Sequence, residues 1–543
     1  MKSEAQKIII GYDSLKSARS TFDQSLRDIT YYVLPEYENA NEDTTGDDVP
    51  DRPVSSAPTR LAIELGANIN SYTYRQGDEN FSLRTVNDDD NYEAKDWLAD
   101  ATKKAIKALQ NSNFTESYNE MCRLYPTYGT GCVSSSYDKE RAELVFRNHS
   151  VSGNLYFIED EKGNVCGAYR LLKYTASQAR EKYSGLPEEL IEAANNPSKI
   201  SDRFDFIQMV VKNPKYNPRR KDWQSWKYRS VHVFRKEEII VHEEGFRTFP
   251  FHVPRFIKMR EFTYGYGCGH LALPAIRELN RVQADLPDAI EMAVHRPTMF
   301  GDEDSANEYA SKPNHVGFAD MTQGQPWQPD VDAKSANVLA EYIQTLYQEL
   351  VSLFFSDVFL SISQRWDQEK TAREVDELSE EKLSTIAPIV SRLQSEFWSP
   401  MIERIVDLLI DAGVIEQPPE SIAGKGFRVV YTSRIDTKLA AIEVNKTLQA
   451  SSEAQRLIAM ELETPTITDV IKIYDAAQDV LEKRNFNLDF VVRKSDREKL
   501  QKARDAAMAR QEQSEAMQNM AGPVNLSKKP EPGSPLQKME GAT

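Results

Sequence analysis

The sequence predicts an α+β protein that is mainly helical, and three patterns support this. Long stretches near both ends and in the middle carry apolar residues at helical spacing. Between residues 132 and 263, apolar and polar residues alternate in short runs, which is typical of antiparallel strands. Two long helical runs then flank about thirty turn-rich residues. The chain has 543 residues, more than one hydrophobic core usually serves, so two or more domains are expected.

Composition and charge narrow the classes of function. Hydrophobic residues make up 40% of the chain and charged residues 28%, which fits a folded protein. The net charge is −17, whereas a sequence-specific DNA-binding module normally carries a basic surplus. Tight neutralisation of phosphates is therefore not expected to be the main task. A net acidic surface repels DNA, which suits a protein past which DNA slides.

The cysteines and the N-terminus indicate the compartment. The four cysteines are widely spaced and form no CxxC pair, so reduced thiols are expected. The chain starts MKSEAQKIII, which lacks the pattern of a secretory signal, and no apolar run approaches a membrane span. We therefore expect a protein that is made in the cytoplasm, with no membrane partner.

The N-terminal region is predicted to be helical. Apolar residues recur at steps of three to five over residues 1–34, and similar patterns predict helices over about 56–75, 93–112 and 114–128. An acidic stretch follows the first helix. From Glu36 to Asp51 it holds seven carboxylates and no base, so it is expected to be a loop.

The strands are expected between residues 132 and 263. Their alternating runs are VSSSY, ELVFRNH, NLYFIED, NVCGAYRLL, FDFIQMVVK, YRSVHVFR and EEIIVHEE. A helical stretch, TASQAREKYSGLPEELIEAANN, interrupts them. Farther on, residues 370–413 are predicted to be helical, and Pro388 and Pro400 should each kink or break that helix. GFRVVYTS, at 426–433, is predicted as a strand.

Short motifs were each weighed against an ordinary structural role. Gly265, Gly267 and Gly269 precede a helix, but His270 stands where GxGxxG requires its third glycine, so a tight structural turn is favoured over phosphate binding. Cys268 and His270 lack the further ligands that a zinc site needs. No P-loop, GxSxG elbow or adjacent nucleophile and base occurs. The sequence therefore predicts neither catalytic, cofactor nor metal residues, although a triad from distant segments stays possible.

Three carboxylates on the first long run stand out. Asp285, Asp288 and Glu291 follow at steps of three and so share one helix face. In a monomer that face is simply solvated, whereas in a ring it faces the lumen. The segment 356–370, SDVFLSISQRWDQEK, combines serines with Arg365, which permits either a packed connector or a contact with a nucleic-acid backbone.

Several segments, in the same order along the chain, resemble the portal proteins (head-to-tail connectors) of short-tailed bacteriophages. The turn and helix start YGYGCGHLALPAIRELN resembles that family's tyrosine-glycine turn followed by ALP-x-I/L-x-x-LN. The resemblance covers residues 17 to about 445, through SARSTFDQSLRDITYYVLPE, NLYFIEDEKGNVCGAYR, FPFHVPRFIKMREF, KTAREV, FWSPMIERIVDLLIDAGVI and YTSRIDTKLAA. The family usually has arginine and proline where this chain has Cys268 and His270, so subunit contacts do not transfer residue by residue.

The resemblance implies the portal fold, a ring subunit with a wing, a stem, a clip and a crown. Its parts along the chain are then the wing (1–268), the first stem helix (269–300), the clip (301–331), the second stem helix (332–355), the tunnel loop (356–370), the long wing helix and strand (371–436), the crown helices (437–520) and a disordered tail (521–543).

The resemblance also implies a function without catalysis. The protein is expected to form a ring, as a dodecamer, at one capsid vertex of the virion, assembled in the host cytoplasm. Double-stranded DNA passes through the channel without sequence recognition, and the implied partners are terminase, a tail adaptor, and the major capsid and scaffolding proteins. The alternative is a cytosolic hydrolase or transferase with a helical substrate domain.

The implied site residues fall into three groups. Asp285, Asp288 and Glu291 would face the channel from the stem. Phe318 and Trp327 of the clip would bind partners. The tunnel loop would present to the channel Ser361, Ser363, Gln364, Arg365 and Lys370.

Overall fold

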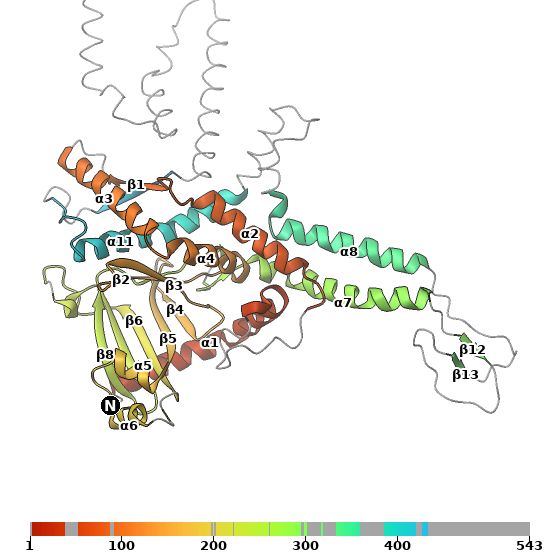
Figure 1. Cartoon of the computed structure of the whole chain (residues 1–543), viewed down its shortest axis with the longest axis horizontal. Helices are drawn as coiled ribbons and strands as arrows, with labels where there is room; N and C mark the ends of the chain where they lie inside the picture. The colour runs from red at the N-terminus through yellow and green to blue at the C-terminus, as the bar shows by residue number, and fades with distance from the viewer. Residues whose placement is uncertain are drawn as a thin grey trace, which may run out of the picture. The chain divides into compact units, whose positions relative to one another are not determined.

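The structure is a computed structural model that divides into two compact units, Met1–Leu439 and Ala440–Thr543. It describes residues 3–37, 53–86, 92–196, 199, 202–220, 222–259, 261–294, 298–300, 316–318, 333–358, 385–419 and 426–432, all within the first unit. The expected crown (437–520) and tail (521–543) lie outside the described residues. Within the first unit, helices and strands are mixed, as the α+β prediction requires (Figure 1).

Four helices make up the N-terminal part, close to where periodicity predicts them. They are α1 (Glu4–Val33), α2 (Ala57–Thr73), α3 (Tyr92–Gln110) and α4 (Phe114–Tyr128). The first begins with a capping box, in which the Ser3 hydroxyl and the Gln6 side chain satisfy each other's backbone N–H groups. The last ends at Gly129, whose φ of +78° is one that glycine adopts without strain.

A five-stranded antiparallel sheet follows, with its strands in the order β4-β5-β6-β7-β8. These strands are Leu155–Glu159, Val165–Thr175, Arg203–Lys212, Tyr228–Phe234 and Ile239–Phe246. Consecutive strands pair with their neighbours, so the sheet is a simple meander whose loops lie at its two ends. The helical interruption expected between β5 and β6 is present as α5 (Ala176–Lys182) and α6 (Glu188–Asn195).

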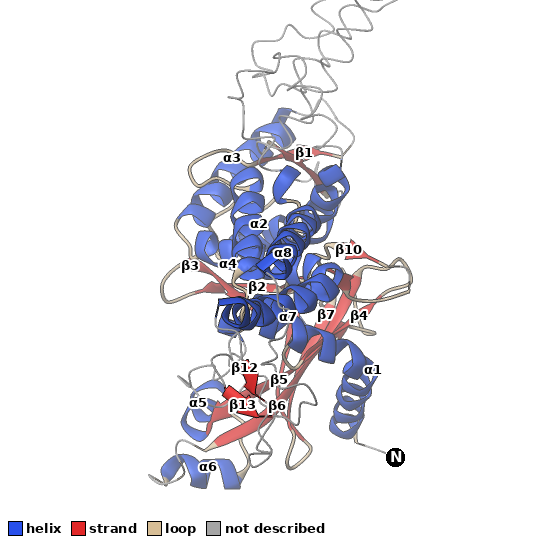
Figure 2. Cartoon of the chain, turned by 90° about the vertical axis from the view of Figure 1, so that its right-hand side faces the viewer, coloured by secondary structure: helices blue, strands red, loops and turns tan. Residues whose placement is uncertain are grey.

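Helices cover both faces of this sheet (Figure 2). The first part of α1 packs on one face, where Ile8 and Tyr12 join a buried cluster with Tyr156, Ile207 and Val231. The opposite face packs against α5 and α6 through a second cluster, made of Ala179, Tyr183, Leu190, Phe206, Phe234 and Val241. Alternate residues of each strand therefore point into one of two cores.

A smaller sheet, in the order β3-β2-β9, links this layer to the helices. It consists of β2 (Val133–Asp138), β3 (Glu143–Asn148) and β9 (Phe251–His252). The open edge of β3 is closed by Asn113, whose amide accepts from the Phe146 N–H at 2.8 Å and donates to its carbonyl at 2.8 Å. Side-chain pairing of this kind protects an edge strand from further strand addition.

The strand predicted at 426–433 is present as β14 (Phe427–Tyr431), but its pairing with β1 (Phe81–Thr85) was not predicted from the sequence. β1 pairs antiparallel with β14, although more than three hundred residues separate them. Beside it, the helix expected near Pro388 and Pro400 runs to residue 393, widens into the π-helical turn η3 (Gln394–Trp398), and continues as α11 (Ser399–Asp411). Pro400, which has no N–H to donate, lies two residues after this turn, so the irregularity expected near it takes the form of a π-turn. The break expected at Pro388 is absent, because residues 385–393 are continuously helical.

Two long helices run side by side, α7 (Cys268–Val294) and α8 (Ala333–Leu353) (Figure 1). α7 is shorter than the range 269–300 expected from the pattern, because residues 298–300 form a strand. Pro297 gives a physical reason, because a proline disfavours the helical conformation in the residue that precedes it. That strand, β12 (Thr298–Phe300), pairs in parallel with β13 (Val316–Phe318).

None of the helices within the described ranges is both long and apolar enough to cross a membrane. All four cysteines are free, and burial raises the pKa of each thiol.

Candidate functional site

The candidate site is the pair α7 and α8, and it begins at a glycine-rich turn. Here the chain touches the end of α4 so closely that side chains do not fit. A Cβ on Gly265 would lie 2.1 Å from the Gly129 carbonyl oxygen, and one on Gly267 would lie 2.4 Å from the Gly129 nitrogen. The Gly265 N–H donates to the Thr130 hydroxyl at 2.8 Å. The glycines therefore allow close backbone packing, as expected for the tight structural turn that the sequence predicts.

Cys268 and His270 of this turn are part of the core. Cys268 is fully buried. The His270 ring stacks on Phe22 of α1 with centroids 5.0 Å apart, and its Nδ1 accepts from the Gly267 N–H at 3.3 Å. Burial lowers the pKa of His270 to about 4, so its ring is neutral at physiological pH. Among the residues that the structure describes, no group of three His, Cys, Asp or Glu side chains could hold a metal ion.

A buried ion network lies just before the turn, and its centre is Arg255, which is only 2% exposed. Its guanidinium binds both carboxylate oxygens of Glu396 in η3, at 2.6 and 3.0 Å, and also contacts Glu159 at the end of β4. It donates to the Gly163 carbonyl at 2.9 Å. Lys258 binds Glu159 at 2.5 Å. Arg255 therefore ties the sheet, the turn and η3 together.

The inner half of α7 is packed into the first unit. Ala272, Ile276 and Leu279 are buried. Arg277 forms an ion pair with Asp28 of α1 at 2.6 Å. The Asn280 side chain accepts from the Ser55 N–H at 3.0 Å, which ties the segment before α2 to α7. These contacts anchor the helix at its base.

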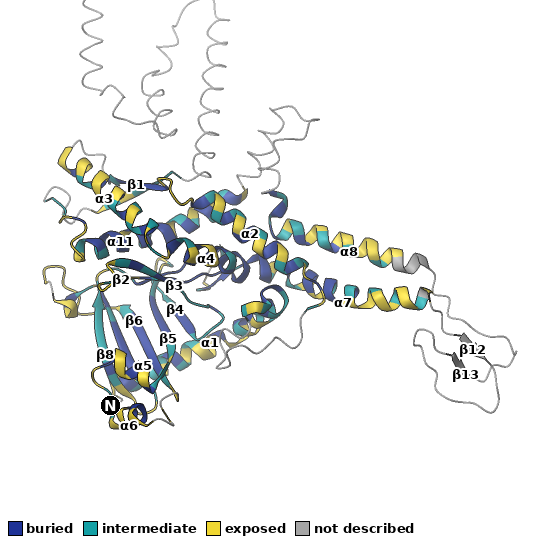
Figure 3. Cartoon of the chain, viewed as in Figure 1, coloured by how far each residue is buried: buried dark blue, intermediate teal, exposed yellow. Residues whose placement is uncertain are grey.

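The outer half of α7 is open, and the predicted carboxylates lie there. Asp285, Asp288 and Glu291 are all exposed. Figure 3 shows exposed positions in yellow along the outer part of α7. Arg281, one turn before Asp285, is held by Glu278 at 2.6 Å. That hydrogen bond, together with the charges of Glu278 and Asp285, raises the pKa of Arg281. The outer half of the helix thus presents an acidic stripe to solvent, made of Asp285, Asp288 and Glu291.

Apolar side chains on the other side of α7 are exposed as well. Ile290 is 46% exposed and Val294 is 68% exposed, and they continue the face that is buried nearer the base. On α8, Val338 and Tyr342 are 62% and 43% exposed. An open groove follows this side of α7, lined by Val54, Gln283, Leu286, Pro287, Ile290, Glu291 and Val294. Within the described part of the chain, nothing covers this apolar surface.

The other predicted site residues belong to the clip and to the tunnel loop. Phe318 ends strand β13, but its side chain is outside the described residues, as is the whole of Trp327. The tunnel-loop residues expected to contact DNA also lie outside them, in the range 359–384. Two phenylalanines lie just before that loop. Phe354 is buried, and the ring centroids of Phe355 and Phe256 are 6.1 Å apart. The backbone of Phe355 has a φ of +56°.

Two serine–histidine pairs were missed by the sequence analysis. Ser135 and His252 lie 2.8 Å apart, as do Ser134 and His149. Burial, together with the charge of Arg404, lowers the pKa of His252 to about 3, and burial beside Arg170 does the same for His149. Ser135 is 2% exposed, so a substrate has no path to its hydroxyl. These pairs join strands and do not make a nucleophile with its base.

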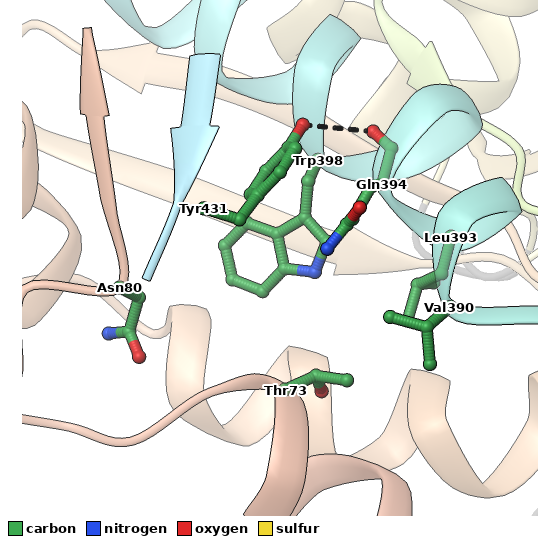
Figure 4. A pocket seen from close by; sticks show the side chains of 7 residues that line it. All are labelled: Thr73, Asn80, Val390, Leu393, Gln394, Trp398 and Tyr431. Carbon is green, nitrogen blue, oxygen red and sulfur yellow. Dashed lines mark hydrogen bonds between the residues drawn. The ribbon is translucent and has the colours of Figure 1, made fainter. Parts of the chain in front are cut away.

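A small enclosed cavity lies where η3 meets β1 and β14 (Figure 4). Tyr431 donates to the Gln394 carbonyl at 3.1 Å on one side of it, and Thr73 and Asn80 close the other. Its volume is about 10 Å³, which is barely enough for one water molecule. This cavity is a packing defect beside the π-turn and has no room for a substrate.

The chain was compared with known proteins. It matches the family described as "Bacteriophage head to tail connecting protein" over residues 5–491. It is 22% identical over 455 residues to the "Probable portal protein" of Bordetella phage BPP-1, covering 82% of this chain and 81% of that one. It is 23% identical over 491 residues to the "Portal protein" of Salmonella phage epsilon15, covering 88% and 87%.

Proposed function

The chain belongs to the family of bacteriophage head-to-tail connecting proteins, and we propose that it forms the ring at one capsid vertex through which DNA enters and leaves. It acts as a portal protein: the family match spans residues 5–491, and two portal proteins align with more than four-fifths of the chain. The observation that supports a ring is the outer half of α7. This part of the helix has one acidic face and one apolar face, and both faces are exposed.

The two exposed faces support a specific arrangement of copies. Apolar side chains such as Ile290 and Val338 are stabilised when a neighbouring helix covers them. If copies pack side by side around an axis, the acidic stripe on α7 is left to face the lumen. α7 has 27 residues and is about 40 Å long, enough to line a channel. A stripe repeated around the ring repels phosphate, so DNA slides without settling in one register.

The partners follow from the same proposal. We place terminase during packaging, and the tail adaptor afterwards, on residues 301–331, where Phe318 and Trp327 supply apolar contacts. Residues 356–370 are proposed to reach the channel, where Ser361, Ser363, Gln364, Arg365 and Lys370 touch DNA transiently. Major capsid and scaffolding proteins would surround the ring, which is assembled in the host cytoplasm and kept in the virion.

The enzyme alternative has little support in the described residues. The Ser135–His252 pair is buried, the Ser134–His149 pair is partly buried, and the cavity beside η3 is too small for a substrate. The family is structural, so we propose that the chain catalyses no reaction. A purified ring that hydrolyses ATP in the absence of terminase would contradict this proposal.

The first prediction is the mass of the native particle. About twelve copies of a 61.9 kDa chain give a ring near 0.7 MDa, and mass photometry of the purified protein should show that species. Images at moderate resolution should show an axial channel, with residues 301–331 at one end and 356–370 near the axis. A protein that stays monomeric at every salt concentration, or a ring with 356–370 on its outer surface, would contradict the assignment.

The second prediction concerns the exposed apolar side chains. Replacing Ile290 and Val338 with serine should leave the fold intact, because neither is buried in the single chain. Each should lose about 1–2 kcal/mol of contact with a neighbouring copy, so the subunit contact weakens at least tenfold. Ring and monomer fractions at decreasing protein concentration measure this effect. The control replaces Ile191 and Val414, which are 43% and 42% exposed, with serine. Equal loss of rings in both variants would count against the helix contact.

A further inference from the structure

The loop that joins β6 to β7 is strongly basic, in a chain whose net charge is −17. Residues 212–227, KNPKYNPRRKDWQSWK, contain six lysines or arginines and one aspartate. The aspartate, Asp222, accepts a hydrogen bond from the Ser225 hydroxyl at 2.9 Å, so it is engaged within the loop. Neither Arg219 nor Arg220 has a side-chain partner within the part of the chain that the structure describes, and both are exposed.

The described residues of the loop are held by hydrogen bonds in spite of their exposure. Asn213 is buried and donates to the carbonyls of Gln224 and Trp226 at 2.8 and 2.9 Å. The Asn217 N–H donates to the Ser225 carbonyl at 3.0 Å. The short helical turn η2 (Trp223–Ser225) sits directly on β8, where a Cβ on Gly245 would lie 2.2 Å from the Trp223 carbonyl oxygen. A binding surface that is already ordered loses little entropy when a partner binds.

Aromatic side chains stand among the charges. Tyr216 is 51% exposed and Trp223 is 39% exposed, on the same loop as the two free arginines. Tyrosine, tryptophan and arginine are the residues most enriched where proteins bind each other tightly. The exposed part of the Trp223 side chain is therefore available to a partner.

The loop lies far from the proposed channel. Arg229, which follows the loop at the start of β7, forms an ion pair with Glu4 in the first turn of α1 at 2.5 Å. The loop therefore sits at the first turn of α1, whereas Asp28, at the other end of that helix, pairs with Arg277 of α7. Twenty-four residues of helix separate the two points, which is about 36 Å. DNA in the channel is thus out of reach of this loop.

We propose that the β6–β7 loop, through Arg219, Arg220 and Trp223, is a docking site for an acidic polypeptide segment of a partner protein. The free guanidiniums bind carboxylates in the two-pronged geometry that arginine favours, and Trp223 packs against an apolar side chain between them. The competing ligand, duplex DNA, presents a continuous line of phosphates and needs many basic contacts. Here the loop has a basic surplus of only a few residues and the rest of the chain is net acidic, so a short segment fits better than a long duplex.

The test uses the full-length protein and a fluorescein-labelled peptide of about twelve residues, half of them glutamate and one leucine, read by fluorescence anisotropy. The unmodified protein should bind the peptide, and added salt should weaken binding. Replacing Arg219 and Arg220 with glutamate should reduce affinity tenfold or more. Trp223→Ala should also reduce it, several-fold, with the charge unchanged. Both variants should keep the melting temperature, because these side chains are exposed.

A matched control removes two other exposed bases. Lys139→Glu together with Arg141→Glu changes the charge equally in the turn between β2 and β3, and it should leave peptide binding unchanged. Three results would overturn the proposal: no binding of the peptide by the unmodified protein, equal loss in the control, or tighter binding of a labelled DNA duplex that the Arg219 and Arg220 variant abolishes. The last result would identify the loop as a nucleic-acid contact.

Discussion

Arg255→Ala is expected to destabilise the first unit by about 3–5 kcal/mol, because it leaves two partly buried carboxylates without their main partner. Glu159 and Glu396 are 16% and 14% exposed, so water replaces the lost guanidinium poorly. The carbonyl of Gly163 also loses its arginine donor. Lys258 and Arg392 stay close to the two carboxylates, which keeps the loss toward the lower end of the range. Urea unfolding of the full chain, followed by tryptophan fluorescence, measures the shift.

Two further variants separate the network from general damage. Arg255→Lys keeps the charge but not the paired hydrogen bonds to Glu396. We therefore expect it to lose less stability than Arg255→Ala, but still to be less stable than the unmodified protein. In the double variant Arg255→Ala with Glu396→Ala, the loss should be smaller than the sum of the single losses, because no unpaired Glu396 remains. Arg75→Ala, in an exposed pair with Asp78, should change stability by less than about 0.5 kcal/mol. If Arg255→Ala is as mild as Arg75→Ala, the network does not hold the turn.

The sequence predicted most of the elements because their apolar spacing is local. The four N-terminal helices and the strands from Val133 to Phe246 each show their period within a window of ten to twenty residues. The β1–β14 pair was missed for the opposite reason. β1 has five residues, and the strand that completes it lies more than three hundred residues away. β14 was predicted from its own residues, but no local pattern shows which distant segment a strand pairs with.

Side-chain networks were equally hidden. Arg255 meets Glu396 across 141 positions, and Ser135 meets His252 across 117, so no spacing rule connects them. The acidic stripe on α7 could be predicted, since steps of three place carboxylates on one face of a helix. The exposed apolar face beside the stripe could not be predicted, because the sequence does not show at which residue of α7 the contacts with the rest of the first unit end.

The largest functional effect is expected from reversing that stripe. Replacing Asp285, Asp288 and Glu291 with lysine changes the charge of each subunit by +6, and about twelve copies would line the proposed channel with bases. Each added lysine gains a contact with a passing phosphate, so DNA binds where it should slide. Packaging of DNA into heads should slow severely or stall. Nuclease-protected DNA per head, measured in an in vitro packaging reaction, reports this.

The fold and the ring should survive this change, because all three side chains are exposed. Asp285 and Asp288 are not part of the lining of the apolar groove, and Glu291, which lines it, is replaced by another long side chain that can keep its charge in water. Native mass should therefore equal that of the unmodified ring. A matched control changes Glu93, Asp96 and Asp100 to lysine on the exposed face of α3, with the same change in charge, and packaging should stay near normal. The neutral variant, Asp285→Asn with Asp288→Asn and Glu291→Gln, should slow packaging less than the lysine variant. Screening by salt shortens the reach of exposed charges, so the difference should be largest at low ionic strength. Normal packaging by the lysine variant under those conditions would show that the stripe on α7 does not face the DNA.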